Sequence, residues 1–502
     1  MPFDASFDKR PTSVPTLANA QLAGTIGHPG GHRPTSYTFS VKGFLPLIVV
    51  GVALLLSLLG SDWIPGLSIM ILWGAWKYLS REPGPPVIAA AFTHQWLQVT
   101  IAVLYSAVTG RTITQMEQVD YRPMMLIGLC SLVSLFAGFY FAAGWRRTAA
   151  RSERRNGLPI ALKTLAVAYA ISLMAASVMQ SFAWDHPQLT QVVLALSLVR
   201  YIVLFLLVRG LATPRLRLGW ILTILAGEVA IGFTGFFADF REPLVVIGLS
   251  LLGAVDRGRL RTWLLVGLVA VVAVVAGILW TTIKPAIREN FDYAEAGATR
   301  LRNAAQAADA SLSSPAVKWA FHTDTTVARV WALYYPALAV ARVPAVLPHE
   351  NGDLLLQVVE HVLAPRFLFP DKPDLPSTSD KVRKYAGVWV SGRETKTSFA
   401  FGYAAESYVD FGVPLMFLPI FVFGLFAGLG YRLLARAIVT FELRSAALTV
   451  LFWSSLSLFE VSWVMMVGLG VTQAVVLVTV LVSAERFLLN RNLDASSALV
   501  RA

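Results

Sequence analysis

The chain has 502 residues, of which 56% are hydrophobic and only 14% are charged. Soluble domains contain about 25% charged residues, so this composition excludes an ordinary soluble enzyme and an intrinsically disordered protein. The single cysteine, Cys130, excludes an intramolecular disulfide and any cysteine-based zinc or iron–sulfur site.

Long apolar runs follow an N-terminal segment, residues 1–42, that is rich in Pro, Gly, Thr and Ser and that we expect to be a disordered cytoplasmic tail. An apolar run of about 18 residues suffices to cross the hydrocarbon core of a bilayer, about 30 Å thick. The sequence therefore predicts an all-α polytopic membrane protein with about twelve transmembrane helices, nine within 43–283 and three within 412–485. The predicted spans are 43–60, 62–79, 86–108, 123–145, 158–184, 188–209, 218–238, 242–255, 262–283, 412–434, 446–466 and 468–485.

The distribution of charge predicts the orientation of these spans. Clusters of Lys and Arg fall on one side when the N-terminus is placed in the cytoplasm, as the positive-inside rule requires. The C-terminal tail, residues 486–502, is then cytoplasmic, and the long segment 284–411 lies outside. That segment holds 14 basic and 14 acidic residues, so the whole net charge of +12 lies elsewhere in the chain. The basic character thus follows from membrane topology, and we expect no nucleic-acid partner.

Three ionisable residues fall near the middle of predicted spans: Arg200, Glu228 and Glu460. Such residues are costly in a bilayer and are functional by default. Arg200 and Glu228 suit a structural ion pair, whereas Glu228 and Glu460 would suit a proton relay in a transporter. For His94 and Gln95 we expect hydrogen bonds between helices.

The external segment 284–411 is too long for a passive connector. Its aromatic residues favour an ordered structure. Residues 326–342 predict an amphipathic helix in the outer membrane interface, kinked or broken at Pro336. Arg329 and Arg342 flank it and would reach for phosphate groups, or would only anchor the helix at the interface.

The later part of this segment contains two further motifs. In residues 349–373, three prolines stand around Arg366 and Lys372, and rigid proline turns hold neighbouring side chains in place. The sequence FGYAAESYVDFGVP, residues 401–414, leads into the tenth span, and its glycines Gly402 and Gly412 permit close backbone approach.

The proline-bounded PRFLFPDKP, the Thr/Ser-rich stretch and the AESYVDFG sequence together resemble the bacterial oligosaccharide repeat-unit polymerases, the Wzy-type family of O-antigen and exopolysaccharide synthesis. Glu406, Tyr408, Phe411 and Gly412 match a Glu-x-Tyr-x-Asn-Phe-Gly signature of that family, and Asp410 replaces its usual Asn. An arginine on the outer side of a central helix pair is matched by Arg241, in the hairpin ADFRE. The resemblance covers roughly residues 220–470.

The resemblance implies a GT-C-like, O-antigen polymerase/ligase-like architecture in the bacterial inner membrane. It implies glycosyl transfer on the outer face without nucleotide sugar, metal or cofactor. A hydroxyl of a new undecaprenyl-diphosphate-linked oligosaccharide would attack the growing chain, and the lipid diphosphate would leave. A chain-length regulator and a flippase are family-typical partners. A ligase with another acceptor, and a proton-coupled transporter or flippase, remain the alternatives.

The residues suited to this chemistry are of two kinds. Arginine is well suited to a diphosphate leaving group, and a general base must take the proton of the acceptor hydroxyl. The catalytic candidates are Arg241, Arg329, Arg366, Glu406 and His361, with His322, His349 and Glu360 as further candidate bases. The candidate substrate-binding residues are Arg342, Lys372, Glu360, Tyr408 and Asp410.

Overall fold

The structure is a computed structural model that describes residues 41–81, 84–144, 160–185, 189–213, 216–233, 241–254, 260–289, 319–364, 375–392 and 401–501, and single residues between 299 and 309 and between 369 and 399. The chain divides into two compact units, Met1–Pro46 and Leu47–Ala502. Apart from the first residues of α1, the elements below belong to the second unit, and the predicted tail 1–42 lies almost wholly outside the described residues.

The described residues form helices and no strand. The first part of the chain contains α1 (Val41–Leu59), α2 (Ile64–Leu79), α3 (Val87–Thr109), α4 (Thr114–Glu117), α5 (Tyr121–Ala143), α7 (Leu162–Asp185), α8 (Thr190–Ala212), α9 (Leu218–Gly232), α10 (Arg241–Ala254) and α11 (Leu260–Glu289). The predicted external segment contains α13 (Trp319–Val330), α14 (Tyr334–Arg342), α15 (Asp353–Leu363), α16 (Thr378–Lys381), the π-helix η2 (Val382–Ala386) and α17 (Tyr403–Phe411). The chain ends with α18 (Phe417–Ala437), α19 (Phe441–Leu456), the π-helix η4 (Met465–Leu469) and α20 (Gly470–Arg501).

Six helical stretches of the described residues are long and apolar enough to cross a membrane: Val87–Thr109, Tyr121–Ala143, Thr190–Ala212, Leu264–Thr281, Phe417–Ala437 and Met465–Phe487. Each of the twelve predicted spans overlaps a helix. By length and apolarity, however, the described residues give six membrane-crossing helices and not twelve. Several of the other helices are too short: α10, with 14 residues, is only about 21 Å long, and α19, with 16, about 24 Å.

At four places the helices differ from the predicted boundaries. The predicted span 446–466 is not continuous, because residues 457–462 between α19 and η4 are not helical. Helix α11 continues to Glu289, beyond the predicted start of the external segment, and α20 continues as a helix to Arg501. The predicted helix 326–342 is two helices, α13 and α14, and the break falls before Pro336 because that proline lies in the first turn of α14, where its missing N–H costs nothing.

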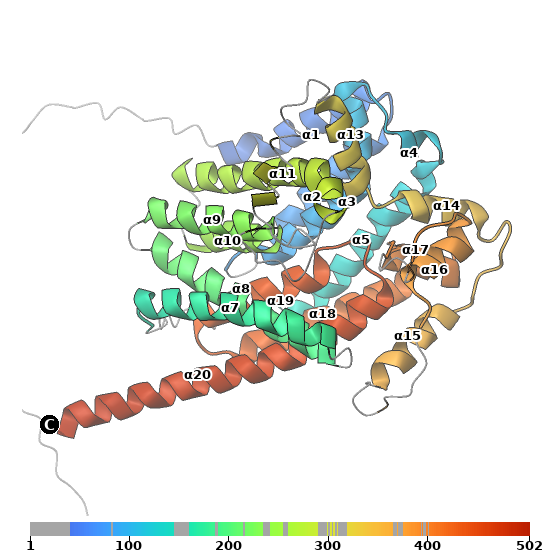
Figure 1. Cartoon of the computed structure of the whole chain (residues 1–502). Helices are drawn as coiled ribbons and strands as arrows, with labels where there is room; N and C mark the ends of the chain where they lie inside the picture. Colours follow the sequence, from blue (N-terminus) through green and yellow to red (C-terminus); the bar gives the residue numbers. More distant parts are fainter. Residues whose placement is uncertain are drawn as a thin grey trace, which may run out of the picture. The chain divides into compact units, whose positions relative to one another are not determined.

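The most extensive contact between two described helices joins α5 and α18, which lie side by side in Figure 1. Small residues allow their backbones to approach closely. A Cβ atom placed on Gly424 would lie 2.1 Å from the carbonyl oxygen of Leu135, and one on Gly428 would lie 2.3 Å from that of Phe139. These glycines are therefore required by helix packing rather than by backbone conformation.

The predicted external segment has its own hydrophobic core, as its aromatic content led us to expect. Buried residues of α14, α15, η2 and α17 and of the chain between η2 and α17 form this second core: Ala339, Val343, Leu354, Val382, Tyr385, Ala386, Val390, Phe401, Ala405 and Val409. The large core is formed mainly by the other helices, and it also includes Ala337 of α14, Val358 of α15, and Tyr403 and Ala404 of α17.

Candidate functional site

Helix α17 carries the signature residues, and its acidic side chains are buried. Glu406 is 0% exposed. Its Oε1 accepts a hydrogen bond from Lys381 Nζ at 2.8 Å, and its Oε2 accepts one from the backbone N–H of Trp463 at 3.0 Å. Because both oxygens are engaged inside the protein, the geometry favours a positioning role for Glu406 over direct catalysis.

Asp410 is equally buried and caps a neighbouring helix. Its Oδ1 accepts a hydrogen bond from the backbone N–H of Leu354 at 3.0 Å, and its Oδ2 accepts one from Leu355 at 2.9 Å. The carboxylate thus satisfies two of the free N–H groups at the start of α15. Tyr408 donates its hydroxyl to the carbonyl of Val343 at 3.0 Å.

The non-helical residues 457–462, here called the interruption, are held by polar side chains of α3. His94 Nδ1 lies 2.6 Å from the carbonyl oxygen of Ser457, and Gln98 Oε1 accepts a hydrogen bond from the backbone N–H of Phe459 at 2.7 Å. Gln95 donates to the carbonyl of Leu456 at 2.6 Å. The predicted hydrogen bonds of His94 and Gln95 to another helix segment are therefore confirmed.

Helix α17 fixes the other side of the interruption. The backbone N–H of Tyr403 donates to the carbonyl of Val461 at 2.7 Å, and its hydroxyl donates to Gln95 Oε1 at 2.9 Å. Gly402 has a φ of +86°, and a Cβ atom there would lie 3.0 Å from the carbonyl oxygen of Phe459. The expected close backbone approach at this glycine is confirmed.

A charged cluster lies at the interruption. Arg241, at the start of α10, and Arg329, at the end of α13, both act electrostatically on the carboxylate of Glu460. Arg241 also forms an ion pair with Glu242, whose Oε2 accepts a hydrogen bond from the indole of Trp453 at 2.6 Å. Arg241 is partly exposed and Arg329 is exposed, so both guanidinium groups remain accessible from outside the protein.

Helix α13 is positioned by contacts at its first half. Asp324 forms an ion pair with Arg111 and accepts a hydrogen bond from Tyr105 at 2.5 Å. Tyr105 belongs to α3, the helix that also holds the interruption. Two predicted arginines that are 88 positions apart in the sequence thus both lie within electrostatic range of one carboxylate, that of Glu460.

The other predicted residues lie elsewhere. Arg342 ends α14, and its guanidinium covers Gly387, where a Cβ atom would lie 2.6 Å from Cζ. Its Nε is buried without a hydrogen-bond partner in the described part of the chain. Glu360 and His361 lie on α15, which contacts α17 and η4. Arg366 and Lys372 lie outside the described residues.

The remaining candidate bases are also separated. His322 lies in α13, one turn before Thr326, whose hydroxyl donates to its carbonyl. His349 packs over the C-terminal end of α17, where a Cβ atom on Gly412, at a φ of +63°, would lie 2.8 Å from its Nε2. Glu460 was noted in the sequence as a charge within a span. The interruption that exposes it to two arginines was not foreseen, because it depends on contacts with distant residues of α3 and α17.

The predicted ion pair between Arg200 and Glu228 is confirmed. Glu228 is 1% exposed and also accepts a hydrogen bond from the hydroxyl of Tyr169. The three residues link α7, α8 and α9. This carboxylate is committed to a structural contact, which leaves it poorly suited to a proton relay.

The six long apolar helices and the buried polar contacts between them define the chain as a helical membrane protein. It belongs to the family described as domain of unknown function DUF8712, whose model matches residues 99–443. The matched region includes α10, α13 and α17 and ends before the interruption. No curated protein and no solved structure matches the chain.

Proposed function

We propose that the protein polymerises undecaprenyl-diphosphate-linked oligosaccharide repeat units into a polysaccharide on the outer face of a bacterial inner membrane. The observation that supports this proposal is that Arg241 and Arg329 both lie within electrostatic range of Glu460, a residue of the non-helical interruption. Non-helical backbone within a membrane-embedded bundle is tolerated where it is buried in protein or lines an aqueous space.

The two arginines suit a diphosphate leaving group. In the proposed reaction, the acceptor hydroxyl oxygen bonds to the anomeric carbon of the growing chain while the bond from that carbon to the diphosphate breaks. The leaving diphosphate gains negative charge, and guanidinium groups aimed at it stabilise that charge. The hydroxyl proton passes to a carboxylate, and Glu460 is the carboxylate within electrostatic reach of both arginines.

The signature residues of α17 support this site indirectly. Glu406 joins Lys381 to the backbone of Trp463, and Asp410 caps α15. These contacts keep the predicted external segment and the interruption in one arrangement. The proposal therefore assigns catalysis to Arg241, Arg329 and Glu460 and positioning to α17.

The proposal includes twelve crossings, cytoplasmic termini and an external segment 284–411, as the charge distribution predicts. The short helices α10 and α19 would then cross together with the residues that flank them. Arg241, at the start of α10, would lie at the outer side, at the depth of a diphosphate anchored in the outer leaflet.

The experiment is to replace the chromosomal copy by variants and to analyse surface polysaccharide and extracted lipid-linked oligosaccharides. We expect Arg241→Ala and Arg329→Ala to abolish long polymer and to accumulate single repeats on the outer leaflet. Arg122→Ala, an exposed arginine paired with Asp62, is the matched control and should leave the polymer unchanged.

Other outcomes would redirect the proposal. Long polymer that stays attached to its lipid would indicate a ligase, and single repeats retained on the cytoplasmic side would indicate a flippase. A transporter would lose function with Glu228→Gln and tolerate Arg241→Ala. Unchanged polysaccharide in all arginine variants would refute glycosyl transfer at this cluster.

A further inference from the structure

Trp389 is the most exposed tryptophan whose exposure the structure describes. It lies between η2 and α17, next to the second core, and 76% of its surface is open to solvent. Burying an indole ordinarily stabilises a protein by several kcal/mol. A tryptophan that stays in solvent therefore indicates either a binding partner outside the chain or a structural role within it.

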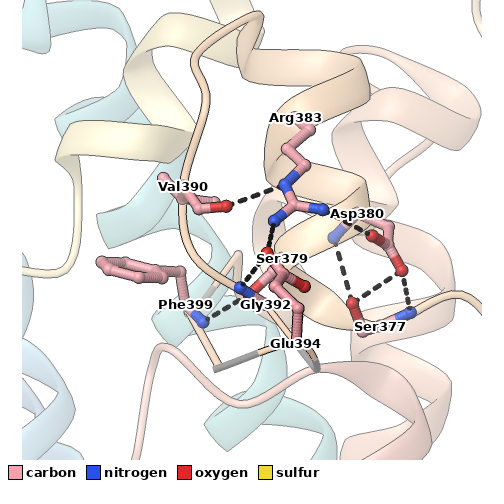
Figure 2. Close-up of polar contacts among 8 residues, drawn as sticks. All are labelled: Ser377, Ser379, Asp380, Arg383, Val390, Gly392, Glu394 and Phe399. Atoms are coloured by element: carbon pink, nitrogen blue, oxygen red, sulfur yellow. Dashed lines mark hydrogen bonds and ion pairs between the residues drawn. The ribbon is translucent and has the colours of Figure 1, made fainter. Parts of the chain in front are cut away.

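Arg383 supports one face of this ring. Its Cζ lies 5.5 Å from the centroid of the Trp389 ring, within the range of a cation–π contact. Arg383 Nε donates to the carbonyl of Val390 at 2.8 Å, and Nη2 forms an ion pair with Glu394. Figure 2 shows Arg383 held between Val390 on one side and Asp380 and Glu394 on the other.

The chain that carries Trp389 is fixed on both sides. Glu394 Oε1 accepts a hydrogen bond from the backbone N–H of Gly392 at 2.9 Å, and Ser379 Oγ accepts one from Phe399 at 3.0 Å (Figure 2). Ser377 and Asp380 form a reciprocal capping box at the start of α16. The indole is thus presented from a rigid support, which lowers the entropy cost of binding a ligand.

The helix beneath is fixed as well. Lys384 Nζ and the Tyr385 hydroxyl both donate to Glu350 Oε1, at 2.7 and 2.8 Å. The hydrogen bond from Lys384 lowers the pKa of Glu350. Tyr385 in turn stacks on Phe401 in the second core. A ligand can therefore reach the open face of the indole without a movement of η2 or of the chain that carries Trp389.

We propose that Trp389 stacks against a pyranose ring of a glycan, with Asp380 and Glu394 at its edge. The face of an indole carries negative potential and attracts the partly positive C–H groups of a sugar ring. Asp380 and Glu394 are 48% and 50% exposed, so their carboxylate oxygens can accept hydrogen bonds from sugar hydroxyls. Two carboxylates beside one guanidinium favour a neutral sugar over an anionic one.

The surroundings distinguish this site from a membrane anchor. An interfacial tryptophan packs beside aliphatic side chains that enter the lipid. Trp389 instead lies against Arg383, which forms an ion pair with Glu394, beside a core formed only by the predicted external segment. The glycan site rests on the proposed function, since it would hold a sugar portion of the polymer away from the cluster at Glu460.

The test uses the full chain in lipid nanodiscs, with polysaccharide released from host cells by mild acid as the probe. Binding is measured by calorimetric titration for the wild type and for Trp389→Ala, Trp389→Phe and Trp220→Ala. Trp220 on α9 is 64% exposed and is the matched control. Because Trp389 is exposed, its variants should keep the wild-type melting temperature.

We expect Trp389→Ala to weaken binding about tenfold and Trp389→Phe about threefold, while Trp220→Ala leaves the dissociation constant unchanged. Equal affinity of Trp389→Ala and wild type, or no binding by the wild type, would overturn the glycan site. So would quenching of Trp389 fluorescence by brominated lipids, because that would place the indole in the bilayer. Failure of the polymerase itself would appear separately, as normal polymer in cells that carry Arg241→Ala.

Discussion

At the scale of a single residue, the contacts of Asp410 explain why the chain has an aspartate where the signature that it resembles has an asparagine. Its two carboxylate oxygens each accept one backbone N–H at the start of α15. An asparagine has one carbonyl oxygen and an NH₂ group that cannot accept, so it could not cap both N–H groups in this way. The substitution therefore suits a structural cap.

The same carboxylate predicts a pH dependence of stability. Burial raises the pKa of Asp410 from its ordinary value of 3.8 to about 6, against the opposing hydrogen bonds from Leu354 and Leu355. Between these values the folded protein binds a proton that the unfolded chain does not. The contribution of Asp410 to the free energy of unfolding is therefore fully present below pH 3.8 and is lost as the pH rises through about 6.

This dependence is measurable as the melting temperature in nanodiscs at pH 5.0 and pH 7.5. We expect the difference in melting temperature between wild type and Asp410→Asn to shift in favour of the wild type at the lower pH, by several degrees. Other titrating groups, such as Glu350, affect both proteins alike and cancel. A difference that is the same at both pH values would contradict the assignment.

The candidate site was predictable by residue type more than by role. Arg241 and Arg329 were predicted as members of a site, and the structure brings them to one carboxylate. Glu406 was predicted as catalytic but lies buried against Lys381, a residue 25 positions away that no local pattern connects to it. A buried ion pair between distant residues depends on tertiary packing and leaves no periodicity in the sequence.

At the scale of helices, the packing of α5 on α18 predicts which glycines tolerate a methyl group. Gly424 faces the backbone of α5, whereas a Cβ atom on Gly430 of the same helix would meet nothing within 4 Å. We expect Gly424→Ala to lower the free energy of unfolding by about 2 kcal/mol or more, because backbone atoms must move apart. Gly430→Ala should be neutral or stabilising by up to about 1 kcal/mol.

Thermal unfolding of the two variants in the same detergent is the measurement. Equal melting temperatures would show that α18 does not lie against α5 as closely as the structure has it. Because both substitutions add the same atom to the same helix, lipid exposure and helix propensity do not explain a difference between them.

The helices themselves were largely predictable, and their interruptions were not. Every predicted apolar run overlaps a helix, because long apolar segments have few other ways to satisfy their backbone groups. Residues 457–462 were predicted as part of one span, because the residues on either side of them are mostly apolar. The break depends on Gln95 and Gln98 of α3, more than 350 positions earlier, which replace the lost helical hydrogen bonds.

At the scale of the whole molecule, the contacts across the chain predict which connections share a side of the membrane. The link between α3 and α5 touches the predicted external segment, because Arg111 pairs with Asp324 and Gln118 accepts a hydrogen bond from Tyr334. The link between α18 and α19 lies at the other end of α18, one apolar helix length away from the predicted external segment.

Single cysteines test this arrangement after Cys130 has been changed to alanine. We expect Thr114→Cys and Val346→Cys to react in intact cells with a membrane-impermeant maleimide, and Val439→Cys to react only after permeabilisation. All three positions are exposed, so access to the reagent depends on sidedness. Reaction of Val439→Cys in intact cells would contradict the topology.

The contacts of α17 have a consequence for exchanging parts between relatives. Glu406 joins a lysine of the segment before α17 to the backbone of Trp463, and Tyr403 bonds to both Gln95 and Val461. A chimera that imports residues 319–411 alone would keep the pair of Lys381 and Glu406 but would lose the native partners at Gln95, Val461 and Trp463. A working graft must therefore carry its own counterparts of the α3 glutamines and of residues 457–463, so these three stretches must be exchanged together.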